Sequence, residues 1–202
     1  QSSAQKFSID DILAFISHDQ RTEEHVKCAI ENFFLMAASW NVFDRQGLCI
    51  TDIVRPASLT VLDLSVLPSP MLKDIVVSIL CKKIFEERVR SRKIFEQKKM
   101  GVTVHEHGIP LVWLAVDEAQ VFVPSGKKTL SKEIIIEEWM RQGRQPGLSL
   151  LLATQRPSAV ESEVLSHCDL LICHRLTAQE DIDALGKVRP TYMHGEIGEA
   201  IK

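Results

Sequence analysis

The sequence has 202 residues, 45% of them hydrophobic and 25% charged, which is typical of a globular protein. Its formal net charge of −3 excludes a uniformly basic nucleic-acid-binding protein, so any contact with a polyanion must be local. Its apolar runs are shorter than the ~20 residues of a membrane span, and its five cysteines include no CxxC pair. We therefore expect a cytoplasmic protein with reduced thiols and no membrane segment.

Residues 1–54 are predicted to form a helical segment. Ser8 and Asp11 have the spacing of a capping box, and apolar residues then recur at helical intervals. A second helix is expected to begin near Thr22, with two glutamates in its first turn, where a carboxylate interacts favourably with the helix dipole. The rest of the chain, 55–202, has a different pattern and is predicted to be a second domain.

The segment 55–202 begins with a short predicted strand at 59–65, followed by a long helix. Ser69 and Pro70 are typical of a helix start, and the apolar spacing then continues into a basic stretch. Residues 82–99 contain eight Lys or Arg and three Glu, a net +5 that leaves −8 for the remainder. A helix over 70–99 would be about 45 Å long at ~1.5 Å per residue, so we expect its last turns to project from the core.

Further apolar runs and helical patterns alternate in the second half of the chain. The runs predicted to be strands are 111–117, 148–154 and 170–175. They are almost continuously apolar, which indicates strands buried on both faces and therefore a parallel sheet. The predicted helices cover 131–144, 159–167 and 177–186. The last is expected to begin with Thr177 and Glu180 as a capping box. The alternation predicts an α/β fold with a mostly parallel sheet flanked by helices, whose chemistry lies at the carboxyl ends of the strands.

Two adjacent acids, Asp117 and Glu118, directly follow the apolar run 111–116. At a nucleotide-hydrolysing site the first acid of such a pair can hold Mg²⁺, directly or through water. The second can polarise the attacking water as a general base. Solvated acids at a turn have the same pattern, so the pair alone leaves both interpretations open.

Other polar residues lie at the ends of predicted strands and helices. Gln155 follows the run 148–154, where its amide could hydrogen-bond the γ-phosphate of a nucleotide, although a polar strand end entering a loop has the same pattern. Arg141 and Arg144 lie at the end of a predicted helix, where cations interact favourably with the dipole. They are also candidates for an arginine finger, which neutralises the charge that develops on a transferred phosphoryl group.

Taken together, residues 111–187 resemble the HerA/FtsK superfamily of ring-forming ATPases, and within it the archaeal HerA branch. The matching motifs are DEAQ-x-F-x-P at 117–124, RQGRQPG at 141–147, LLATQRPS at 151–158, VLSHCD at 164–169 and HRL at 174–176. The run 59–65 and the long helix after it are also similar to the core of that family, so the resemblance covers about two-thirds of the chain.

The resemblance implies a RecA-like ATPase core that binds ATP and Mg²⁺. Such proteins assemble as homo-hexamers around double-stranded DNA and act with a NurA-type nuclease in DNA end processing and repair. The resemblance assigns Mg²⁺ binding to Asp117, general-base catalysis to Glu118 and γ-phosphate sensing to Gln155. Arg144, or else Arg141, would be the finger that acts on a neighbouring subunit.

The family also requires a phosphate-binding loop of the form GxxxxGK[ST], which this sequence does not contain. The segment SGKKT at 125–129 has a Gly-Lys pair but lacks the earlier glycine, and we interpret it as a solvent loop. Because the chain begins with Gln1, we expect the missing loop on residues that precede it. The segment 1–54 is then an insert of the ATPase domain, 55–202 is the C-terminal part of its core, and this chain alone is expected to be inactive. Gln120 stands where many relatives have histidine, and we expect little change in chemistry from that.

The basic stretch 82–99 has two interpretations. Cations at the end of a helix are favoured by its dipole and by solvent alone. DNA translocases grip phosphates without reading bases, so lysines and arginines would also suffice for DNA contact. The candidates for such contact are Arg88, Arg90, Arg92 and Lys93. Two other functions stay open: a motor of the same superfamily that moves another substrate in conjugation or packaging, and a non-hydrolysing assembly module.

Overall fold

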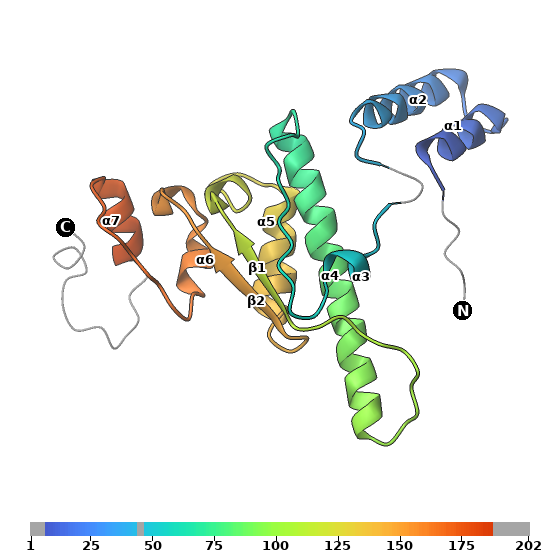
Figure 1. Ribbon diagram of the computed structural model, residues 1–202. Coiled ribbons are helices and arrows are strands. Elements are labelled where there is room, and N and C mark those ends of the chain that lie inside the picture. Colours follow the sequence, from blue (N-terminus) through green and yellow to red (C-terminus); the bar gives the residue numbers. More distant parts are fainter. Residues whose placement is uncertain (1–6, 44–46, 188–202) are drawn as a thin grey trace. The chain divides into compact units, whose positions relative to one another are not determined.

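The computed structural model describes residues 7–43 and 47–187 (Figure 1). The chain divides into two compact units, Gln1–Cys49 and Ile50–Lys202. Parts of both domains predicted from the sequence, 1–54 and 55–202, therefore lie outside the described residues, and their boundary stays a prediction. None of the described helices combines the length and the apolar character that crossing a membrane requires.

The first unit contains two helices that pack on each other, α1 (Ile9–His18) and α2 (Glu24–Ser39). The predicted capping box is present, because the Ser8 side chain accepts from the Asp11 amide and the Asp11 carboxylate accepts from the Ser8 amide at 2.7 Å. The second helix begins later than predicted. The Thr22 hydroxyl donates to Asp19 at 2.5 Å and does not cap α2, whose N-cap position is Glu23.

The second unit begins with a short helix, α3 (Ile50–Ile53), and then the 30-residue helix α4 (Pro70–Lys99). Ser69 caps α4 by accepting from the Leu72 amide at 3.1 Å, and Pro70 takes the first helical position, as the sequence predicts. The helix buries Leu72, Cys81 and Ile84 in the core. Its last turns extend beyond the sheet in Figure 1, and the chain then returns alongside them.

Two parallel strands form the sheet, β1 (Val112–Val116) and β2 (Leu148–Leu152), with Val112 opposite Leu148 and Val116 opposite Leu152. The crossover between them contains η1 (Ala119–Val121), α5 (Leu130–Ile134) and η2 (Ile135–Met140). The second of these helices, α5, packs against α4 together with η2. The predicted α/β fold, with a parallel sheet flanked by helices, is therefore confirmed as a partial fold of two strands.

The helix predicted over 131–144 is interrupted by a π-helical turn, η2. Ile135, Ile136 and Trp139 of this turn are buried, and the Trp139 indole donates to the Cys81 carbonyl at 3.0 Å. The π-helical turn packs these apolar side chains in the core beside α4. The regular helical spacing of the sequence does not indicate a π-helical turn. Such a turn depends on the packing of the neighbouring helix α4, which the local sequence does not contain.

Glu138, also in η2, has one carboxylate oxygen buried without a hydrogen-bond partner, and desolvation raises the pKa of this carboxyl. A carboxyl whose pKa is raised in the folded state destabilises the fold as pH increases above its unfolded value near 4.5. We therefore expect Glu138→Gln to raise the melting temperature at pH 7 more than at pH 4. Thermal unfolding at both pH values checks this, with Glu133→Gln, an exposed acid of α5, as control. An equal effect at both pH values would contradict it.

Two predicted strands are wrong within the described residues. The runs 59–65 and 170–175 are irregular, and many of their apolar side chains are exposed, including Leu59 at 91% and Ile172 at 76%. A strand exists only where a neighbour completes its hydrogen-bond ladder, and neither run pairs with β1 or β2 in this structure. The apolar composition of the sequence therefore predicted more strands than the described residues form.

The last helices are shorter than predicted. The segment predicted as a helix at 159–167 contains the end of a 3₁₀ turn, η3 (Pro157–Ala159), and then α6 (Ser162–Ser166). The helix α7 (Gln179–Gly186) ends at the predicted glycine, but its N-cap position is Ala178 and no side chain caps it. The capping box predicted from Thr177 is therefore wrong, because the helix starts one residue later.

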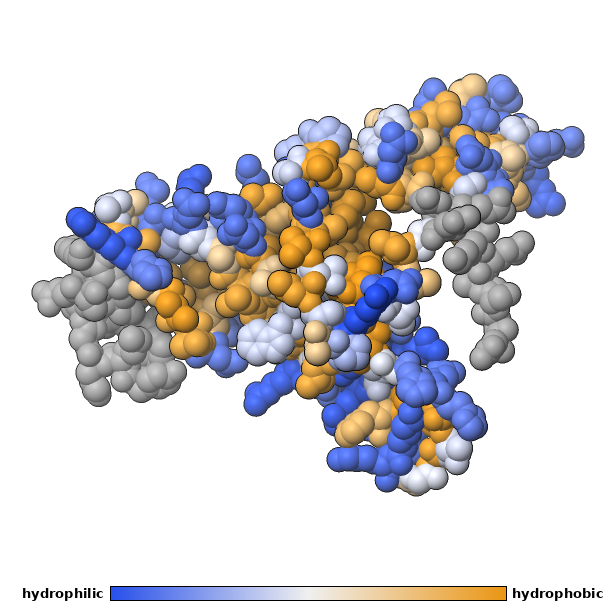
Figure 2. Space-filling model, in the orientation of Figure 1, coloured by the Kyte–Doolittle hydropathy of each residue, from blue (hydrophilic) through white to orange (hydrophobic). Residues whose placement is uncertain are grey.

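One face of the sheet carries apolar side chains that none of the described residues buries. Leu111, Trp113 and Leu151 point to it and are 72%, 75% and 55% exposed, whereas their sequence neighbours Val112, Leu114 and Leu150 pack on the core. Figure 2 shows hydrophobic residues gathered over this part of the molecule. Parallel sheets are normally covered on both faces. Packing on the core explains the apolar side chains on one face of β1 and β2 but not those on the other face.

Candidate active site

The carboxyl ends of β1 and β2 bring Glu118 and Gln155 together. Glu118 follows β1 by two residues and Gln155 follows β2 by three, and parallel strands place both at one edge of the sheet. The Gln155 amide donates to Glu118 Oε1 at 2.8 Å. The backbone holds the two strand ends together, because Ala153 N donates to Val116 O and Ala119 N donates to Ala153 O, each at 2.9 Å.

The backbone at Glu118 is in the left-handed region, with φ of 51° and ψ of 48°. This conformation costs a residue with a side chain ~1–2 kcal/mol, and such strain is concentrated at functional sites. The turn ends β1 and buries Ala119 completely. The Asp117 carboxylate accepts from the Glu118 amide at 2.9 Å, while Asp117 itself is exposed at the same edge. Asp117 is thus exposed, whereas Glu118 is partly buried at the same strand end.

Sequence reasoning assigned no role to two members of this cluster, Gln120, from which little change in chemistry was expected, and Thr154. The Gln120 amide donates to the second carboxylate oxygen, Glu118 Oε2, at 2.5 Å. The Thr154 hydroxyl donates to Gln120 Oε1 at 2.6 Å and accepts from the Arg156 amide at 3.0 Å. Both residues are within two positions of a predicted site residue. A polar side chain so close to the end of an apolar strand is the sequence feature that could have identified them.

The donor set of this edge fits Mg²⁺ with a nucleotide. An exposed carboxylate, Asp117, is the kind of hard oxygen ligand that Mg²⁺ prefers, and this ion usually keeps several waters and the phosphate oxygens of its substrate as further ligands. A cage of three or more protein ligands is not needed for such an ion, and no cluster of that kind occurs among the described residues.

The two candidate finger residues, Arg141 and Arg144, precede the amino end of β2 and do not contact the Glu118 cluster. Arg141 is held by two ion pairs, to Glu137 at 2.7 Å and to Glu163 at 2.6 Å. Arg144 is exposed and forms no ion pair within the described ranges. Among the described residues, neither arginine forms a hydrogen bond or ion pair with the Glu118 cluster of its own chain.

The glycine that closes the RQGRQPG segment has a structural function. Gly147 has φ of +83°, and a Cβ there would lie 2.4 Å from Leu111 Cδ2. The segment thus makes a tight turn into β2 that packs on the start of β1. Part of this motif is explained by packing alone.

The candidates for DNA contact differ in their availability. Arg88 is only 6% exposed; its guanidinium donates to the carbonyls of Ile109 and Pro146, and burial lowers its pKa. Arg90 and Arg92 are on the surface but ion-paired, each at 2.7 Å, with Glu106 and Glu96 respectively. Lys93 is exposed. The buried position of Arg88 is incompatible with a contact to DNA in this conformation.

A lysine links the loop after η1 to the segment after Gln155. Lys132 Nζ donates to the carbonyls of Pro124 at 3.0 Å and Lys127 at 2.9 Å, and it forms an ion pair with Glu161. The hydrogen bond from Lys132 lowers the pKa of Glu161. This ion pair stabilises the two loops that follow the site residues.

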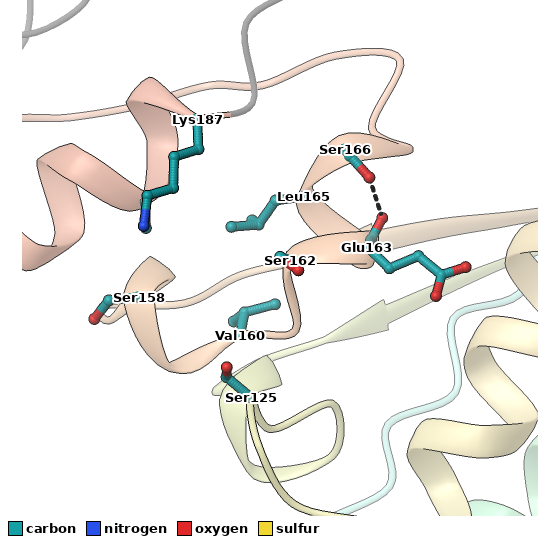
Figure 3. Close-up of a pocket in the computed structure, with 9 residues that line it drawn as sticks. Ser125, Ser158, Val160, Ser162, Glu163, Leu165, Ser166 and Lys187 are labelled. Carbon is teal, nitrogen blue, oxygen red and sulfur yellow. Dashed lines mark hydrogen bonds between the residues drawn. The ribbon is translucent and has the colours of Figure 1, made fainter.

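A pocket of about 400 Å³ lies beside α6 and α7 (Figure 3). Hydroxyl groups and one ammonium group provide most of its polar lining. Its labelled lining residues are Ser125, Ser158, Val160, Ser162, Glu163, Leu165, Ser166 and Lys187. Neither acid of the β1 end lines it, so the pocket is separate from the candidate active site.

No family model matches the sequence. The chain is 30% identical over 146 residues to the DNA double-strand break repair helicase HerA of Pyrococcus furiosus, an alignment that covers 64% of this chain and 26% of that protein. It is 29% identical over 108 residues to a probable helicase of Methanocaldococcus jannaschii, covering 54% of this chain and 19% of that protein. The chain thus spans about a quarter or less of the length of these relatives.

Among solved structures, the chain has a distant likeness to the genome packaging NTPase of Sulfolobus turreted icosahedral virus 2 in complex with AMP. The TM-score is 0.44 at 21% identity, over 70% of this chain and 56% of that one, which is too distant to assign a function. The sequence relatives are more informative. They confirm the resemblance that the motifs indicate: this chain is similar in sequence to the helicase HerA and to a probable helicase.

Proposed function

We propose that this chain is part of the ATPase core of an ATP-driven motor that moves double-stranded DNA. The observation that supports this most is the contact between Glu118 and Gln155 at the carboxyl edge of a parallel sheet, 2.8 Å apart. A general base and a γ-phosphate sensor must both reach the region of the γ-phosphate and the attacking water, which the neighbouring positions of Glu118 and Gln155 allow. The phosphate-binding loop would be supplied by a longer protein that contains this chain, termed the parent protein.

The proposed chemistry divides between the residues of the two strand ends. Asp117 would hold Mg²⁺ through water. ATP would supply the phosphoryl group, and Mg²⁺ would neutralise the charge of its phosphates. Glu118 would accept a proton from the attacking water. Gln155 would hydrogen-bond the γ-phosphate, for which its amide must exchange its contact with Glu118 for one with the phosphate.

A ring assembly would complete this site. Arg144 is exposed and lies away from the Glu118 cluster of its own chain, which favours action on a neighbouring subunit. Arg141 is less suited, because two ion pairs would have to break first. We propose a homo-hexamer, with a NurA-type nuclease as partner in DNA end repair.

The projecting end of α4 is the proposed DNA-contact surface, made by Arg90, Arg92 and Lys93. We expect the double change Arg90→Glu and Arg92→Glu in the parent protein to weaken DNA binding and to flatten its salt dependence. The slope of log K against log salt should fall by ~0.9 for each phosphate that the surface no longer neutralises. Binding titrations at several salt concentrations measure this, with Arg21→Glu as a control outside the surface. An unchanged slope would remove the surface from the proposal.

DNA-stimulated hydrolysis separates the competing functions. We expect the parent protein to hydrolyse ATP faster when double-stranded DNA is added. A motor that serves conjugation or packaging of another substrate would hydrolyse ATP without this stimulation. A parent protein that lacks any GxxxxGK loop and hydrolyses no ATP would instead be a non-hydrolysing assembly module.

A further inference from the structure

We propose that Gln120 is a positioning residue for Glu118, and that Thr154 in turn orients Gln120. This inference rests on the proposed hydrolysis at Glu118. The two carboxylate oxygens of Glu118 have different partners: Gln155 of the β2 end on Oε1 and Gln120 of η1 on Oε2. Gln120 thus holds the side of the carboxylate that faces away from Gln155.

The hydrogen bonds form a chain with a defined direction. The Glu118 carboxylate can only accept, so Gln120 presents its NH₂ group to Oε2 and its own Oε1 to Thr154. The Thr154 hydroxyl donates to Gln120 Oε1 and accepts from the Arg156 amide. Thr154 therefore ties the far end of the Gln120 amide to the backbone that follows β2.

The two amides differ in how firmly they are held. Gln120 is fixed at its oxygen by Thr154, whereas Gln155 is on the surface and its only described side-chain contact is with Glu118. If Gln155 leaves to bind the γ-phosphate, Oε1 becomes free to accept a proton from water while Gln120 still anchors Oε2. Gln120 would thus keep the Glu118 carboxylate in one orientation during the exchange. A residue that only stabilised the fold would not affect this orientation.

Kinetics of the parent protein test this inference. We expect Gln120→Ala and Thr154→Val to lower kcat by ~10–100-fold, because small misplacements of a catalytic group have effects of this size. The KM for ATP should change less than about twofold, because neither side chain is assigned to bind the nucleotide. Thr154→Ser keeps the hydroxyl and should retain kcat. The control is Gln179→Ala, which removes an amide–carboxylate hydrogen bond of 2.8 Å in α7.

A second readout uses the 202-residue chain and does not depend on hydrolysis. In ¹⁵N-labelled chain, Thr154→Val should shift the side-chain amide resonances of Gln120, and Glu118→Gln should shift those of both Gln120 and Gln155. A parent protein without any ATPase activity would overturn the proposed function, while these shifts would still support the hydrogen-bonded chain. Unshifted Gln120 resonances in Thr154→Val, or an unchanged kcat in Gln120→Ala, would overturn the inference itself.

Discussion

Replacing Glu118 by Gln in the parent protein is expected to lower kcat for ATP hydrolysis by about 10²–10⁴-fold, the usual contribution of a positioned general base. The change keeps the size of the side chain, but its NH₂ group cannot accept one of the two hydrogen bonds that Glu118 accepts, and a neutral amide cannot accept the proton of the attacking water. Because Mg²⁺ binding is assigned to Asp117, the affinity for Mg·ATP should stay nearly the same. The variant should therefore bind nucleotide and fail to hydrolyse it.

Two measurements check this expectation, steady-state hydrolysis and equilibrium binding of a fluorescent ATP analogue. Glu180→Gln, which changes an exposed acid in α7, is the matched control and should leave both unchanged. Hydrolysis by Glu118→Gln at more than a tenth of the original rate would mean that another group is the base. A loss of binding together with hydrolysis would instead assign Glu118 to the metal.

Replacing Arg88 by Ala should destabilise the second unit by about 2–5 kcal/mol. The guanidinium is the hydrogen-bond partner of two backbone carbonyls, Ile109 O before β1 and Pro146 O before β2. Each carbonyl left buried without a donor costs ~1–3 kcal/mol. The side chain thus fastens α4 to the starts of both strands, and its removal should loosen the sheet from the helix.

Urea unfolding followed by tryptophan fluorescence measures this effect in a Trp40→Phe background, in which the emission comes from Trp113 and Trp139 of the second unit. Arg92→Ala is the matched control, because Arg92 forms a partly exposed ion pair on the same helix, and ion pairs at the surface contribute ~0–1 kcal/mol. A destabilisation by Arg88→Ala no larger than that of the control would show that the two carbonyls find other donors.

Local patterns in the sequence were sufficient for the elements that depend on nearby residues. Ser69 and Pro70 mark the start of α4 because capping is a contact within one turn. The strands β1 and β2 lie inside the predicted runs 111–117 and 148–154. The proximity of Glu118 and Gln155 also followed, since the carboxyl ends of adjacent parallel strands share one edge.

Features that depend on distant residues could not be predicted in this way. The runs 59–65 and 170–175 have the composition of strands but lack a neighbouring ladder in this structure. Arg88 has the same local charge pattern as Arg90, and only the packing of α4 on the strand starts buries one and exposes the other. The hydrogen bond from Thr154 to Gln120 joins residues 34 positions apart, which no local pattern contains.

The most direct test of the proposed site is a crystal structure of the parent protein with Mg²⁺ and a non-hydrolysable ATP analogue. We expect Mg²⁺ to be joined to the Asp117 carboxylate through water, and the Gln155 amide to lie within ~3 Å of a γ-phosphate oxygen. A water molecule should then occupy the position that Gln155 leaves at Glu118 Oε1. A nucleotide bound away from the carboxyl edge of β1 and β2, with Gln155 still bonded to Glu118, would contradict the proposed mechanism.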